Sequence, residues 1–120
     1  MNRILRWHIP GVLSETGVKD TDVKGNAYKL DRDYIPVECW VRLKSAPSGM
    51  TLIIDINDDG TSIFSERPVM TDNQLDEVFN TFASPHLSML KDSIVTLDID
   101  QVSNSNPGED LVVELWLTAD

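Results

Sequence analysis

Oxygen-bearing side chains at every second position are the clearest chemical signal in this chain of 120 residues. Asp55, Asn57, Asp59, Gly60 and Glu66 match the letter pattern of the calcium loop that joins two helices, in which oxygen ligands surround the ion and glycine permits a sharp turn. The segments on both sides alternate between apolar and polar residues, as strands do. The sequence therefore favours a β-hairpin turn, and it leaves Asp55, Asn57 and Asp59 as a candidate calcium site.

No other grouping of residues indicates a catalytic site. His8 and His86 lie far apart in the sequence, so their spacing does not indicate a metal site or an acid–base pair. Cys39, the single cysteine, alternates with Val37 and Val41 on the side expected to face the core, which favours a buried thiol. The chain has neither a G-x-S-x-G nucleophile motif nor a Gly-rich phosphate loop. We therefore expect a protein that is not an enzyme and uses no cofactor.

Length and charge restrict the possible classes of function. A chain of this length predicts one domain, residues 1–120, and no apolar run is long enough to predict a membrane span. The net charge of −10 argues against direct binding to nucleic acid, which requires a basic face. Residues 61–120 contain two Lys or Arg against eleven Asp or Glu. This acidic half either keeps the protein soluble or docks on a basic partner.

The pattern of apolar residues predicts an all-β fold. Apolar and polar residues alternate in four segments separated by Gly- and Pro-containing turns, which indicates an antiparallel β-sandwich or jelly-roll. We expect residues 34–118 to form the core sandwich and residues 1–33 to form an N-terminal arm or loosely packed strands. The four alternating segments are 37–43, 51–57, 95–100 and 111–118.

At most one short helix is expected, near residues 72–83. Thr71 or Asp72 is suited to cap a helix, and apolar residues follow at helical spacing until Ser84-Pro85 would end it. These apolar residues are Leu75, Val78, Phe79 and Phe82.

Four large apolar residues fall at positions expected to face solvent. Trp40, Ile53, Val112 and Trp116 each alternate with residues assigned to the core. If their strands are neighbours, the four form an exposed apolar patch centred on tryptophan, which is typical of a protein interface. The alternatives are that these positions are covered by a second layer of the same domain, or that they form an aromatic platform for a sugar.

Several motifs occur in a fixed order along residues 35–117. They are the turn Ser45-Ala46-Pro47-Ser48-Gly49 after a strand, the hairpin formed by residues 52–57 and 60–64, Arg67-Pro68, and the strand 97–102 followed by Pro107-Gly108 and Asp110-Leu111. Together they resemble a β-sandwich module found in the virion proteins of tailed bacteriophages, in tail fibres, minor structural proteins and head-decorating proteins. Ser103, where that module often has Gly, and the stretch 71–90 depart from the pattern.

The resemblance implies a structural role in a phage particle, often as a trimer. We therefore expect a capsid decoration protein located in the virion and made in the cytoplasm of the host bacterium. Its expected partners are copies of itself and the major capsid protein or other virion proteins, without nucleic acid or membrane. The alternatives are a receptor- or carbohydrate-binding module on the tail or head surface, and a calcium-dependent adhesion domain.

Overall fold

The computed structural model describes residues 2–14 and 27–120. Within these residues it contains nine β-strands and no helix, and thus no helix that could cross a membrane. The strands are β1 (Asn2–Val12), β2 (Tyr28–Lys29), β3 (Tyr34–Arg42), β4 (Leu52–Asp58), β5 (Thr61–Ser62), β6 (Val69–Met70), β7 (Asp76–Phe79), β8 (Ile94–Gln101) and β9 (Glu109–Ala119).

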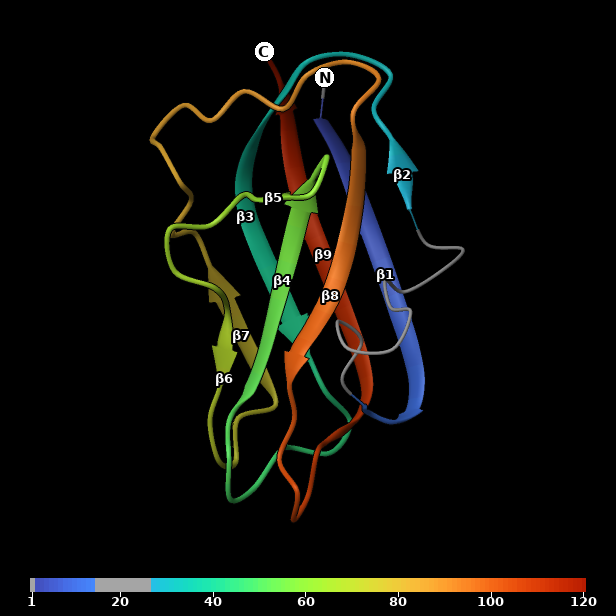
Figure 1. The fold of residues 1–120 in the computed structure, drawn as a ribbon, viewed down its shortest axis with the longest axis vertical. Coiled ribbons are helices and arrows are strands. Elements are labelled where there is room, and N and C mark those ends of the chain that lie inside the picture. The colour runs from blue at the N-terminus through green and yellow to red at the C-terminus, as the bar shows by residue number, and fades with distance from the viewer. Residues whose placement is uncertain (1, 15–26) are drawn as a thin grey trace.

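The strands form two antiparallel sheets that pack face to face (Figure 1). Sheet A has the order β1-β9-β3-β7, and sheet B has the order β2-β8-β4-β5, with β6 also paired to β4. Each sheet alternates strands from the beginning and the end of the chain, which is the wound order of a jelly-roll. The predicted all-β sandwich is therefore confirmed.

The core lies between the inner faces of the two sheets. Alternate residues of each long strand point inward, because successive side chains of a strand face opposite sides of its sheet. From β8 and β9, for example, the core receives Val95, Leu97, Ile99, Leu111, Val113, Leu115 and Leu117, each at most 1% exposed. The sequence assigned these residues to the core by their alternation alone.

Residues 2–12, which the sequence placed in an N-terminal arm or in loosely packed strands, form strand β1 of sheet A. β1 pairs with β9 continuously from Asn2–Thr118 to Ile9–Leu111. Trp7 is fully buried, and its ring makes an edge-to-face contact with Tyr28 at 5.2 Å between ring centroids. β1 is therefore held by both backbone pairing and core packing.

The Asp-Gly turn after β4 is the expected hairpin. Asp59 and Gly60 have φ angles of 48° and 85°, and Asp58 pairs with Thr61 across the turn. Positive φ at both central residues is the requirement of the tight hairpin turn that Asp-Gly favours. Local sequence chemistry was sufficient for this prediction.

The interpretation of residues 72–83 as a short helix is wrong. Asn73 has a φ of 66°, which breaks a right-handed helix, and residues 76–79 pair with β3 as strand β7. Leu75 and Val78 are 47% and 48% exposed, so the apolar residues at helical spacing did not mark core positions. The open edge of β3 offers a hydrogen-bonding partner instead, and that long-range contact outweighs the local helical spacing.

Candidate functional site

The outer face of sheet A gathers the residues that could make contacts. The strand pairing aligns side chains from different strands in rows across this face. One row contains His8, Val112, Arg42 and Asp76, the next contains Arg6, Glu114, Trp40 and Val78, and the third contains Ile4, Trp116 and Glu38. The face thus interleaves apolar groups with both signs of charge.

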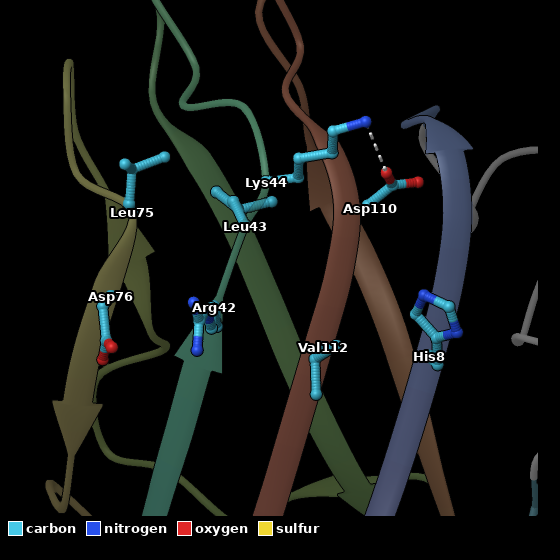
Figure 2. A pocket seen from close by; sticks show the side chains of 8 residues that line it. All are labelled: His8, Arg42, Leu43, Lys44, Leu75, Asp76, Asp110 and Val112. Carbon is cyan, nitrogen blue, oxygen red and sulfur yellow. Dashed lines mark ion pairs between the residues drawn. The ribbon is translucent and has the colours of Figure 1, made fainter.

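One end of this face is an open hollow of about 730 Å³ (Figure 2). The hollow is lined by the first of these rows, whose four residues come from four strands. At its rim, Lys44 Nζ lies 4.0 Å from Asp110 Oδ2. Charges of both signs face each other here, so the hollow suits a polar, hydrogen-bonding group. The lining residues are His8, Arg42, Leu43, Lys44, Leu75, Asp76, Asp110 and Val112.

The opposite end is an apolar groove formed by Ile4, Val37 and Trp116. These side chains are 52%, 50% and 42% exposed, and they come from three adjacent strands. Ile4 and His8 are four residues apart on β1, so the groove lies about 13 Å from the hollow. Apolar groups that cluster on a surface in this way are typical of contacts with another macromolecule.

Both tryptophans on this face are held by carboxylates. The Trp40 indole nitrogen donates to Asp76 Oδ1 at 2.6 Å, and the Trp116 indole nitrogen donates to Glu114 Oε1 at 3.0 Å. Glu114 also lies 3.8 Å from the Arg6 guanidinium nitrogen. Each indole ring is therefore held in its orientation by a hydrogen bond within the chain.

Three of the four residues predicted to form a patch share this face. Trp40, Val112 and Trp116 lie on the adjacent strands β3 and β9, and β1 and β7 join the same sheet at its edges instead of covering it. Ile53 does not belong with them, because β4 is in sheet B and pairs Ile53 with Val69 and Gln101. The one-patch prediction is therefore wrong for Ile53.

Sequence reasoning missed Ile4 and Val37. Val37 was assigned to the core, but the β3–β9 register shifts between Pro36 and Glu38 and leaves Val37 half exposed. Pro36 was the available signal, since proline inside a strand often marks a bulge. For Ile4 the signal was its position, which is opposite in parity to buried Leu5 and Trp7.

The calcium candidates are engaged by separate protein groups. Asp55 accepts a hydrogen bond from Ser62, Asn57 donates to Asp98, and Asp59 Oδ1 accepts from the Ile94 backbone at 2.8 Å. In the parts of the chain that the structure describes, no three His, Cys, Asp or Glu residues are grouped to hold a metal ion. Asp59 joins its turn to β8, which gives this aspartate a structural role.

Asp55 lies directly opposite Asp98 in the β4–β8 ladder and is 8% exposed. Burial raises the pKa of the Asp55 carboxyl, the charge of Asp100 raises it further, and the Ser62 hydrogen bond lowers it. A carboxyl whose pKa is raised by folding stabilises the protein below its unfolded pKa, and this contribution disappears as pH rises through the folded pKa. At neutral pH the Asp55 charge is therefore destabilising.

Asp55→Asn should raise the free energy of unfolding by up to about 1 kcal/mol at neutral pH, because it removes a buried charge that Asp100 also repels and keeps the oxygen that Ser62 bonds. The gain should vanish below the ordinary aspartate pKa of 3.8, where wild-type Asp55 is protonated in both states. Urea unfolding at several pH values measures both effects, with exposed Glu66→Gln as control. A gain that does not depend on pH would contradict this account.

The cysteine and the two histidines do not form a catalytic group in the structure. Cys39 is fully buried, and burial raises the pKa of its thiol to about 12, as expected for a core residue. His8 is exposed on β1, and His86 is exposed in the segment between β7 and β8. Cys39 therefore lacks the accessible thiolate that a nucleophile requires.

Comparison with known proteins adds no relative. No family model, no curated protein and no solved structure matches this chain.

Proposed function

We propose that this chain is a non-enzymatic structural protein of a tailed-bacteriophage virion, acting as a capsid decoration protein through contacts between subunits. The observation that carries the proposal is the exposed apolar groove of Ile4, Val37 and Trp116, on the same sheet face as the half-buried Trp40. Burying such a groove against a neighbouring subunit removes apolar area from water, which stabilises assembly.

Charge supports a contact on this side of the molecule. The outer face of sheet A carries Arg6 and Arg42 against Glu38, Glu114 and Asp76, so it is nearly neutral although the chain carries −10. The outer side of sheet B carries Asp55, Asp98 and Asp100, with Arg67 paired to Asp100 at 2.9 Å. Two acidic subunits therefore meet with the least repulsion through sheet A.

The second candidate function is a carbohydrate- or receptor-binding module. It is favoured by the hollow, where Arg42, Asp76 and Asp110 offer hydrogen bonds beside Trp40. Jelly-rolls serve both as viral capsid and as lectin domains, so the fold class is compatible with both candidates. A glycan array probed with purified protein separates them: binding that Asp76→Ala abolishes would favour the second candidate.

The virion proposal is tested on particles produced from the genome that encodes this chain. Quantitative mass spectrometry of purified virions should detect the protein in many copies, as a surface subunit requires. Absence of the protein from purified particles would overturn the proposal.

A further inference from the structure

The two edges of sheet A expose complementary backbone groups. Tyr28 Oη accepts from the Arg6 amide at 3.3 Å and donates to the Arg6 carbonyl at 2.5 Å, so the Arg6 peptide groups point away from β9. Along a strand, the backbone N–H and C=O groups of successive residues point to opposite edges. The peptide groups of Ile4 and His8 therefore also point to the outer edge of β1. Among residues 2–14 and 27–120, β1 pairs with β9 alone. It is thus a long edge strand of the described sheet, and such a strand in principle accepts another strand.

The other edge of sheet A is β7. The Leu43 amide donates to the Leu75 carbonyl at 2.8 Å, so odd-numbered residues of this segment face β3. By the same alternation, the peptide groups of Asp76 and Val78 point outward. Among the described residues, β7 pairs with β3 alone.

These two edges carry opposite charge. Residues 1–14 contain Arg3, Arg6 and His8 and no carboxylate side chain. β7 begins with Asp76 and Glu77, and residues 68–90 contain no Lys or Arg. Although Arg3 and Arg6 lie near Asp31 and Glu114 of the same chain, β1 carries more Lys and Arg than any other described strand. It is therefore the described strand that best complements an acidic strand of another copy.

We propose that copies of this chain join edge to edge, with β7 of one copy pairing antiparallel to β1 of the next. Strand directions alternate across β1, β9, β3 and β7, so a second copy in the same orientation continues the alternation. One register sets Arg6 opposite Asp76 of the neighbouring copy, and it also sets Ile4 opposite Val78. Both apolar side chains are about half exposed in the single chain.

The contact joins different surfaces of the two copies, so it closes into a ring or continues as a filament. A closed ring of three copies agrees with the trimer that the resemblance to phage virion modules implies. The inference rests on the proposed function, since it supplies the geometry by which subunits associate. It also extends the apolar groove, because Ile4 belongs to both surfaces.

Tyr28 regulates this edge in the single chain. Its hydroxyl satisfies the two Arg6 peptide groups that the neighbouring strand would take, so association must displace it. Tyr28→Phe removes the competing hydroxyl and keeps the ring against Trp7. This variant should associate more tightly than the wild type, whereas a purely structural role of the hydroxyl would leave association unchanged or weaken it.

Charge reversal tests the pairing directly. Arg6→Asp and Asp76→Arg should each raise the dissociation constant at least about tenfold, because each places like charges opposite each other. The double variant should recover most of the affinity. Sedimentation velocity over a concentration series measures each dissociation constant. Glu66→Arg and Arg32→Asp repeat the two charge changes at exposed sites outside β1 and β7.

Circular dichroism and melting curves establish that each variant folds, which matters because Asp76→Arg removes the acceptor of the Trp40 indole. If the wild type assembles and neither single substitution weakens that assembly, the edge pairing is overturned. Assembly through the groove would then still stand. A wild type that stays monomeric would contradict self-association by either surface. Equal weakening by the control variants would show that only net charge matters, which also contradicts the pairing.

Discussion

Trp7→Ala should lower the free energy of unfolding by about 3–5 kcal/mol, the range for removing a large aromatic side chain from a core. Trp7 is fully buried, and its edge-to-face contact with Tyr28 joins β1 of sheet A to β2 of sheet B. Natural domains are stable by only about 5–15 kcal/mol, so this single change removes a large part of the total. Equilibrium unfolding in urea, followed by tryptophan fluorescence and circular dichroism, measures it.

The matched control is Ile4→Ala on the same strand. Ile4 is 52% exposed on the outer face, so its removal should cost well under 1 kcal/mol. Both residues lie in the β1–β9 ladder, so the difference between the two variants measures the contribution of core packing alone. Equal, small effects at the two positions would mean that β1 contributes little to the core, like the arm or loosely packed strand expected from the sequence.

Trp116→Ser should weaken self-association by about thirtyfold or more while leaving the subunit folded. Tryptophans at the centre of an interface commonly contribute at least about 2 kcal/mol, which corresponds to roughly that factor in a dissociation constant. Trp116 is 42% exposed and contributes to the apolar groove with Ile4 and Val37. The removed indole also frees Glu114, which is still near Arg6.

Leu90→Ser is the control for this effect. Leu90 is 58% exposed, more than Trp116, but it precedes β8 and does not contribute to the groove. Analytical ultracentrifugation of both variants should show weakened association for Trp116→Ser and wild-type association for Leu90→Ser. Unchanged association of Trp116→Ser would remove the groove from the account.

Local chemistry explains which parts of the fold were predictable. The alternation in β8 and β9 and the Asp59-Gly60 turn are determined by neighbouring residues, so the sequence was enough to predict them. The roles of β1 and β7 depend on strands far away in the chain. β7 forms because it pairs with the edge of β3, and no pattern within residues 71–83 indicates that this partner is present.

The candidate site was predictable to the same extent. Alternation correctly placed Trp40, Val112 and Trp116 on an outer face, because parity determines which side of a sheet a residue occupies. Parity does not tell which of the two sheets a strand joins, so Ile53 was grouped with them. The hollow was not foreseen, since it depends on the pairing that places Asp76 beside Arg42.

The solution mass of the wild-type protein, measured by light scattering over a range of concentrations, tests most directly the claim that copies of this chain assemble through sheet A. We predict a mass that is a multiple of the 13.5 kDa chain, with a trimer favoured. A mass of 13.5 kDa at every concentration would contradict the claim.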